Sequence, residues 1–157
     1  DEIRSRGLGD VYKRQIPDAC IGADIIVGFP SETDDDFQKS YDFIESLNIS
    51  YLHVFSYSER QNTKAIKIKN KVSKAKKAER SFTMRELSKE LKLSFEQSFV
   101  GSTREVLFEY QIDNQWFGYS DNYLPVRVNT EKNLKNSIES VNIVNSVKNY
   151  LVGSFLN

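Results

Sequence analysis

The residue types that most often carry out chemistry are scarce in this chain of 157 residues, which has one Cys and one His. A metal site needs three or four ligands at compatible spacing, and Cys20 and His53 each stand alone. We therefore expect neither a metal site nor a catalytic residue within this chain. Cys20 is interpreted as a small buried apolar residue, and His53 as a core residue whose hydrogen-bonding groups have partners. A lone Cys also fits a reducing compartment, so a cytoplasmic location is expected.

The segment best placed to contact a ligand is Gly28-Phe29-Pro30. It ends a run of branched apolar residues that predicts a strand over about 23–28, buried on both faces. Thr33 is the expected N-cap of a helix over about 34–47, whose first turn holds three Asp. Ligands of parallel α/β proteins bind at the carboxyl ends of strands, where this loop lies. The acidic helix start disfavours phosphate, and leaves a neutral or cationic ligand group or a purely structural turn.

Residues 50–57 form a second apolar and aromatic run, which predicts another strand. The order strand, helix, strand implies parallel strands joined by a right-handed crossover. The polar segment 58–65 follows this second strand and is expected on the same rim as Gly28-Phe29-Pro30.

Charge is sorted along the chain although the net charge is zero. Residues 16–59 hold nine acidic residues and one Lys, whereas residues 60–92 hold twelve Lys and Arg and three Glu. Residues 93–157 hold seven acidic and five basic residues. Within the basic segment, helical spacing predicts a helix over about 75–99 with Met84, Leu87, Leu91 and Phe95 as its buried stripe. Such a basic segment is either a solvated face or a surface that binds phosphates.

After Gly101 the spacing of apolar residues changes from the 3.6-residue period of a helix to the 2-residue period of a strand. Short strand-like runs near 105–109, 115–120, 123–128, 137–143 and 147–155 predict a small closed or nearly closed barrel. Pro125, in the third run, predicts an edge strand or a bulge. The fold class is therefore α/β followed by a small all-β barrel, with domains at 16–100 and 101–157.

Aromatic residues near basic residues in the barrel segment suit nucleic acid, because cations attract phosphates and rings stack on bases. Several of these rings must also fill the barrel core. No run of eighteen apolar residues occurs, so a membrane is not an expected partner. RNA is the expected nucleic acid, and DNA is not an expected partner. The candidate RNA-binding residues, including three lysines of the basic segment, are Lys74, Lys76, Lys77, Arg104, Trp116, Phe117, Tyr119, Tyr123 and Arg127.

The residue pattern of positions 1–15 does not resemble that of the rest of the chain. They resemble a translated adaptor sequence found at the ends of fragmentary reading frames, which would place the start of the protein's own sequence near Ile16 and extend it upstream. The alternative is a disordered basic tail.

Two blocks of the chain resemble the radical S-adenosylmethionine (radical SAM) methylthiotransferases. The matching residues are 17–30 with Glu32, Thr33, Asp36 and Phe37, and then 53–58 with Arg60 and 63–65. Residues from about 100 onward resemble that family's C-terminal TRAM domain, a small OB-like RNA-binding barrel. Ser31 stands where the family usually has Gly, and Glu59, Gln61 and Asn62 stand where it has Pro, Pro and Gly.

The resemblance implies the C-terminal βαβ part of a partial radical-SAM (βα) barrel, followed by the TRAM barrel. S-adenosylmethionine (SAM) and [4Fe-4S] clusters are the implied cofactors, the clusters being held by a three-cysteine motif absent from this chain. The chain alone is therefore expected to be inactive. The implied cofactor-binding residues are Gly28, Phe29, Pro30, Glu32, Tyr57 and Arg60.

The nearest subgroup acts on N6-threonylcarbamoyladenosine beside the tRNA anticodon, so the anticodon stem-loop is the implied partner. The alternatives are a relative acting on isopentenyladenosine in tRNA, one acting on a ribosomal protein, or a non-catalytic RNA-binding module.

Overall fold

The structure is a computed structural model that describes residues 15–147 and 149–155. The predictions for residues 1–14 lie outside the described residues. The chain divides into two compact units, one containing residues 21–92 and the other residues 16–20 and 93–157. Each unit is described by itself. None of the helices in the described ranges is long and apolar enough to cross a membrane.

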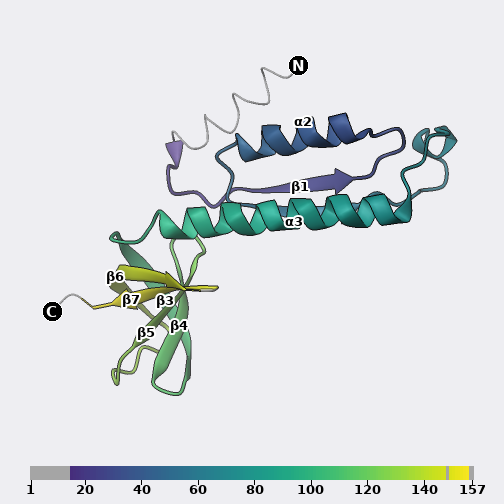
Figure 1. Ribbon diagram of the computed structural model, residues 1–157. Coiled ribbons are helices and arrows are strands. Elements are labelled where there is room, and N and C mark those ends of the chain that lie inside the picture. Colours follow the sequence, from purple (N-terminus) through teal and green to yellow (C-terminus); the bar gives the residue numbers. More distant parts are fainter. Residues whose placement is uncertain (1–14, 148, 156–157) are drawn as a thin grey trace. The chain divides into compact units, whose positions relative to one another are not determined.

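The first unit, here called the βαβ unit, contains β1 (Gly22–Val27), α2 (Asp34–Glu45), β2 (Tyr51–Ser56), the short 3-10 helix η1 (Ala65–Lys67) and most of α3 (Lys74–Gln97). Figure 1 shows α2 and α3 running alongside the strands. The two strands are parallel, with register pairs from Gly22↔Tyr51 to Val27↔Ser56. This confirms the predicted parallel βαβ order.

The start of α2 follows the predicted capping chemistry. The Thr33 hydroxyl accepts a hydrogen bond from the Asp36 amide at 3.1 Å, and the Asp36 carboxylate accepts one from the Thr33 amide at 3.0 Å. This reciprocal pair is a capping box, and it confirms Thr33 as the N-cap. The helix ends at Glu45, two residues before the predicted end, where the Ser46 hydroxyl donates to the Phe43 carbonyl.

The core of the βαβ unit lies on one face of its sheet. Its buried residues come from both strands and both helices: Val27, Ile44, Leu52, Met84 and Leu87. On the opposite face, Ile26 and Phe55 are paired in register and are 61% and 52% exposed. The prediction that the first strand is buried on both faces is therefore wrong for the part of the chain described here, because α2 and α3 pack against the same face.

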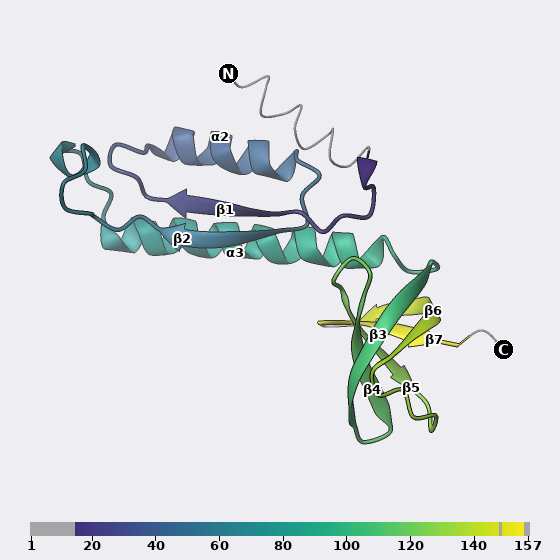
Figure 2. The same cartoon turned by 180° about the vertical axis from the view of Figure 1, so that it is seen from behind.

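The second unit is a closed barrel, as predicted. Its strands are β3 (Thr103–Ile112), β4 (Gln115–Ser120), β5 (Pro125–Asn129), β6 (Ser137–Val147) and β7 (Tyr150–Ser154). They follow the order β3-β4-β5-β7-β6, and pairing between β3 and β6 closes the ring (Figure 2). Neighbouring strands are antiparallel except for β5 and β7, which are parallel.

Irregular positions let these strands curve into a ring. The register shifts in β3 between Phe108 and Tyr110, where a β-bulge adds local bend. On β4, Gly118 faces this site, and a Cβ there would clash with the backbone of Leu107 and Phe108. Pro125 was predicted at an edge or a bulge, but β5 lies between β4 and β7, and Pro125 is its first residue. A first residue can lack an amide hydrogen without interrupting the pairing.

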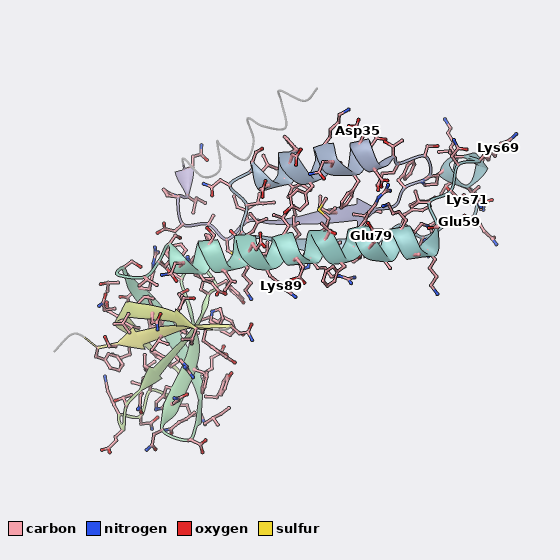
Figure 3. The ribbon with its side chains drawn as sticks, in the orientation of Figure 1. Asp35, Glu59, Lys69, Lys71, Glu79 and Lys89 are labelled. Carbon is pink, nitrogen blue, oxygen red and sulfur yellow. The ribbon has the colours of Figure 1, made fainter. Side chains whose placement is uncertain are left out.

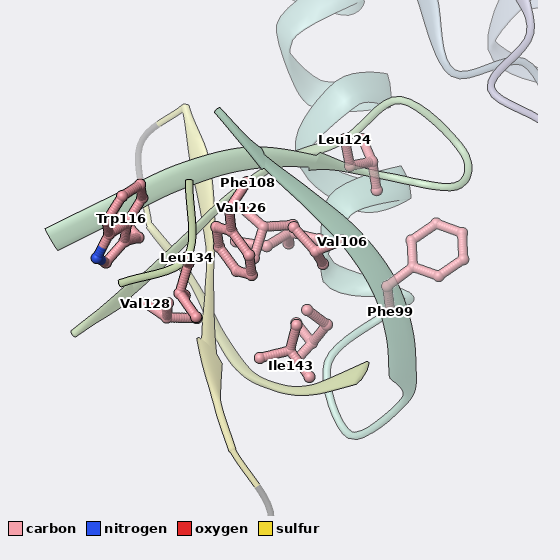
Figure 4. Close-up of a cluster of buried hydrophobic side chains, with 11 residues drawn as sticks. Phe99, Val106, Phe108, Trp116, Leu124, Val126, Val128, Leu134 and Ile143 are labelled. Carbon is pink, nitrogen blue, oxygen red and sulfur yellow. The ribbon is translucent and has the colours of Figure 1, made fainter. Parts of the chain in front are cut away.

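Apolar side chains from all five strands fill the barrel. Figure 4 shows this cluster, with Phe108, Val126 and Ile143 among its labelled members. Phe108 is completely buried among them, and Trp116 is 5% exposed. The buried residues of this core are Phe99, Val106, Phe108, Trp116, Leu124, Val126, Val128, Leu134, Val141, Ile143 and Leu151.

Candidate functional site

The loop after β1 is built around Gly28. Gly28 has a φ of +78°, a left-handed conformation that favours glycine, and it is buried. Its amide donates to both carboxylate oxygens of Glu32, at 3.1 and 3.0 Å. Pro30 is buried, whereas the Phe29 residue is 45% exposed. The loop thus presents one aromatic ring to solvent on a firmly bonded backbone.

The carboxyl end of β2 meets this loop. The Tyr57 amide donates to the Val27 carbonyl at 2.8 Å, and the Tyr57 ring packs edge-on against Phe29 with ring centres 5.2 Å apart. The structure therefore brings together Gly28, Phe29, Pro30 and Tyr57, at the edge where the strand order placed them. We call these four residues the rim.

Arg60, the remaining predicted residue of this loop, is exposed. Its carbonyl accepts a hydrogen bond from the Thr63 hydroxyl. Its guanidinium makes no ion pair with any residue in the described part of the chain, so it is available to an anionic group.

Glu32 supports the rim, and its carboxylate already accepts hydrogen bonds from residues of this chain. Besides the Gly28 amide, it accepts from Arg80, whose other terminal nitrogen donates to Asp34 at 2.9 Å. Hydrogen bonds from Arg80 and Lys76 lower the pKa of Asp34. The interpretation of Glu32 as a direct cofactor ligand does not fit this geometry.

Sequence reasoning missed Arg80, although two signals pointed to it. Arg80 precedes Met84 by four residues, so it lies on the buried stripe of α3. A cation on an apolar stripe must find a partner, and the acidic segment 32–36 supplies one.

The predicted RNA-binding lysines of α3 differ in their surroundings. Lys76 pairs with Asp34 and Glu79, each at 3.1 Å. Lys77 donates to the Tyr57 carbonyl at 3.1 Å and lies over the Tyr57 ring. Lys74 is exposed and forms no ion pair with the residues described. Other basic residues are also paired at the surface, such as Lys71 with Glu59 at 2.7 Å (Figure 3).

On the barrel, β4 directs Phe117 and Tyr119 outward and Trp116 inward. Tyr110 of β3 stacks on Phe117 with ring centres 5.3 Å apart and an interplanar angle of 9°. Tyr150 meets Phe117 edge-on, and Tyr123 lies beside Tyr119. Burial raises the pKa of the Tyr110 phenol. We call Tyr110, Phe117, Tyr119, Tyr123 and Tyr150 the aromatic face.

Trp116 does not belong to the aromatic face, because its side chain is part of the barrel core. Its predicted role as a ring that stacks on bases does not fit this burial. Tyr110 and Tyr150 were missed, because only alternation along β3 and the fold of β7 bring them beside Phe117.

The two arginines predicted to bind RNA also differ. The side chain of Arg104 is 12% exposed, pairs with Asp18 at 2.6 Å and Asp121 at 3.6 Å, and lies over the Phe99 ring. It is thus neutralised within its own unit. Arg127 is half-buried, donates to Gln115 at 3.3 Å and is the register partner of Phe117. A cation therefore stands beside the aromatic face at Arg127.

The donor atoms available do not fit an iron–sulfur cluster. A [4Fe-4S] cluster takes Cys thiolates, and the half-buried Cys20 is the single Cys of the sequence. Among the described residues no group of three or more His, Cys, Asp or Glu side chains could hold a metal ion. His53 was expected in a core, but it is exposed on the uncovered sheet face with its ring edge-on to Tyr51.

The fold and these sites define a two-unit protein: a parallel βαβ unit with the rim at the carboxyl ends of its strands, and a small closed β-barrel with an aromatic outer face. No family model matches the chain. Curated proteins do match it across most of its length.

The chain is 31% identical over 150 residues to a tRNA-2-methylthio-N(6)-dimethylallyladenosine synthase of Ehrlichia chaffeensis, covering 92% of this chain and 34% of the relative. It is 38% identical over 120 residues to the threonylcarbamoyladenosine tRNA methylthiotransferase MtaB of Aquifex aeolicus, covering 71% and 29%. It is 33% identical over 147 residues to the ribosomal protein uS12 methylthiotransferase RimO of Clostridioides difficile, covering 94% and 31%.

The chain belongs to the radical SAM methylthiotransferase family. It spans about a third of the length of the curated relatives that it matches.

Proposed function

We propose that this chain is the C-terminal part of a tRNA methylthiotransferase that adds a methylthio group to C2 of N6-threonylcarbamoyladenosine at tRNA position 37. The observation that carries the proposal is the match across about nine-tenths of the chain to relatives whose names describe methylthio transfer. The identity to the MtaB protein of Aquifex aeolicus, at 38%, favours the threonylcarbamoyladenosine substrate.

In this proposal the rim contacts the adenosine part of SAM. Phe29 offers an exposed ring held in place by Tyr57, and such a ring can stack on an adenine base. Gly28 allows the backbone to turn close to the ligand, and Arg60 offers a free cation nearby in the sequence. Glu32 supports the loop from behind. These residues fit the adenosine part of the cofactor, whereas the described donors do not fit the cluster, so no step of the reaction is assigned to this chain.

The barrel is proposed to be a TRAM-like RNA-binding domain. Its segment has more acidic than basic residues, and Arg104 is already paired, so charge alone does not explain RNA binding by this unit. Stacking of unpaired bases on the aromatic face is the stronger interaction, at about 1–3 kcal/mol per base. Arg127 adds one cation beside it, and the exposed Lys74 is the best candidate among the predicted lysines of the βαβ unit.

The test is binding of the whole chain to a fluorescent tRNA anticodon stem-loop, measured by anisotropy between 50 and 200 mM salt. We expect Phe117→Ala and Tyr119→Ala each to weaken binding about 5- to 150-fold, which corresponds to the loss of one stacked base. Phe55→Ala is the control, because Phe55 is an exposed ring in the other unit, 52% exposed against 42% for Tyr119. No binding to the stem-loop, or equal effects of all three substitutions, would contradict the proposed RNA surface.

Two other functions make different predictions. The 33% identity to a ribosomal protein methylthiotransferase and the acidic balance of the barrel segment favour a basic protein as the second candidate substrate. Tighter binding to ribosomal protein uS12 than to the stem-loop would support that candidate. Recovery of the upstream reading frame separates enzyme from binding module: a Cys-x-x-x-Cys-x-x-Cys motif supports the enzyme, and its absence supports a non-catalytic RNA-binding module.

A further inference from the structure

Three cationic side chains in the first turns of α3 contact groups at or beside the rim. Lys76 pairs with Asp34, and Lys77 donates to the Tyr57 carbonyl. Arg80 reaches furthest, because its guanidinium bonds to both the main-chain carbonyl and the carboxylate of Glu32. The basic start of α3 thus contacts the loop that carries Phe29, and only part of it is a solvated face.

Arg80 is the buried member of this group. It is 3% exposed, and its guanidinium carbon lies 5.5 Å from the centre of the Phe37 ring. Its two terminal nitrogens hold Glu32 and Asp34, at the start of α2. Arg80 therefore joins α3 to the loop between β1 and α2 through a fixed fork of donors.

Stability alone is a weak reason for this arrangement. The cost of removing a guanidinium from water can exceed what its carboxylate partners return, and an apolar residue of similar volume often serves a core equally well. What the ion pair adds is geometry. Arg80 bonds to the Glu32 carboxylate in the orientation in which both of its oxygens accept from the Gly28 amide.

We propose that Arg80 is a positioning residue of the cofactor surface: it holds the Glu32 carboxylate on the Gly28 amide and so fixes the loop that presents Phe29. This inference rests on the proposed function, in which the rim contacts the adenosine part of SAM. Arg80 touches no ligand in this scheme, and it acts through Glu32 on the backbone of Gly28.

The first arm of the test needs no ligand. Hydrogen exchange of individual amides is measured by NMR on the whole chain. We expect Arg80→Gln and Glu32→Ala each to accelerate exchange of the Gly28 amide about 10-fold or more, because a charge-assisted hydrogen bond is lost. The Tyr57 amide is the internal control, since it bonds to the Val27 carbonyl in the same rim and should change less than about 2-fold. Arg85→Gln, an exposed position on the same helix, should change neither amide.

Arg80→Lys keeps the charge but not the fork, so it should restore part of the Gly28 protection. If Arg80→Gln exposes the Gly28 and Tyr57 amides equally, Arg80 is merely structural and the proposal is overturned. If Arg80→Gln does not fold, Arg80→Lys provides the comparison: the Gly28 amide should exchange faster than in the unsubstituted chain while the Tyr57 amide does not, and equal rates of Gly28 exchange in the two chains would overturn the proposal.

The second arm measures SAM binding to the same variants by calorimetry. We expect Arg80→Gln to weaken binding about 10-fold, with partial recovery in Arg80→Lys, and Arg85→Gln to bind as the unsubstituted chain does. Equal affinity in the unsubstituted chain and Arg80→Gln would overturn the positioning role. Absence of SAM binding in the unsubstituted chain would instead overturn the proposed cofactor rim, while the exchange data would still decide whether Arg80 orders Gly28.

Discussion

The barrel and the βαβ unit are each stabilised internally by different interactions. The barrel closes on itself, so every strand is paired on both sides, and eleven buried residues fill its interior. In the described residues, the βαβ unit has two strands, one covered face and an apolar core of five buried side chains, and its rim is fixed by hydrogen bonds and ion pairs. Apolar burial therefore dominates the barrel, whereas polar bonds to the backbone set the conformation of the rim, where the βαβ unit is proposed to contact SAM.

This difference has a functional consequence. In the barrel, the aromatic face can vary without loss of the core, because inward and outward residues alternate along β4. In the βαβ unit, the same residues that stabilise the rim also set its shape. Substitutions should consequently separate folding from binding in the barrel more cleanly than in the βαβ unit.

The largest expected effect is on the barrel core. Phe108→Ala should lower the free energy of unfolding of the barrel by about 3–5 kcal/mol, because it opens a cavity at a fully buried position. Phe55→Ala, on the uncovered face of the other unit, should change stability by less than about 0.5 kcal/mol. Urea unfolding followed by NMR signals from each unit measures both. Loss of the βαβ signals together with those of the barrel in Phe108→Ala would show that the two units do not unfold separately.

Met84→Ala tests the smaller core. Met84 is fully buried between α3 and the covered sheet face, so its truncation should destabilise the βαβ unit by about 2–5 kcal/mol. The same urea experiment should show the signals of β1 and β2 lost first, with those of the barrel unchanged. Phe82→Ala is the control, since Phe82 is exposed on the same helix. Equal effects of the two substitutions would mean that the described core does not hold this unit together.

The two units also differ in how far the sequence predicts them. The barrel's five strands, the parallel βαβ order and the Thr33 cap follow from local patterns, namely alternation, an apolar run and a capping residue. Trp116 and Phe117 show the limit of this approach. They are adjacent, so one must point inward and the other outward, but composition alone does not determine which.

Ion pairs between residues far apart in the sequence are the other limit of prediction from local patterns. The family resemblance implied that Glu32 binds the cofactor, and no local pattern showed its partner Arg80, which lies 48 residues further along the chain. Arg104 was predicted to bind RNA because it lies near aromatic residues of the barrel segment, and its partner Asp18, which precedes β1, could not be foreseen. The charges of a sequence can be counted, but the pairs they form depend on the fold.

A third prediction concerns the polar bonds of the βαβ unit. Thr33→Ala removes the side chain that caps α2 and should destabilise this unit by about 1 kcal/mol. Thr83→Ala is the matched control, because the Thr83 hydroxyl bonds within α3 to the Glu79 carbonyl and caps nothing. Thermal unfolding monitored by circular dichroism measures both. A loss as large as that in Met84→Ala would show that the cap does more than satisfy the helix end.

The same capping box predicts a pH dependence. Hydrogen bonds from Thr33 lower the pKa of Asp36 from its ordinary value of about 3.8, so the folded state favours the carboxylate. The contribution to stability is therefore present above about pH 4 and is lost as the pH falls through the lower folded value. NMR titration should show a low Asp36 pKa that rises toward its ordinary value in Thr33→Ala. An unchanged pKa in that variant would contradict the assigned cause.

The smallest expected effect lies at Ser31, where the resemblance to the family predicts Gly. Ser31 has a φ of +73°, and Asn62, at another position where the family has Gly, has a φ of +66°. A left-handed conformation costs most residues about 1–2 kcal/mol, and Asn less than Ser. Part of this cost is offset because Gly gives the unfolded chain more freedom. Ser31→Gly should therefore stabilise the βαβ unit by about 0.5 kcal/mol, and Asn62→Gly by less. The main-chain amide of residue 31, which donates to the Asn70 carbonyl, is kept in Ser31→Gly and in Asn62→Gly. A larger gain in stability in Ser31→Gly than in Asn62→Gly would therefore identify backbone strain at Ser31 as the cause. A loss of stability in Ser31→Gly would contradict this cause.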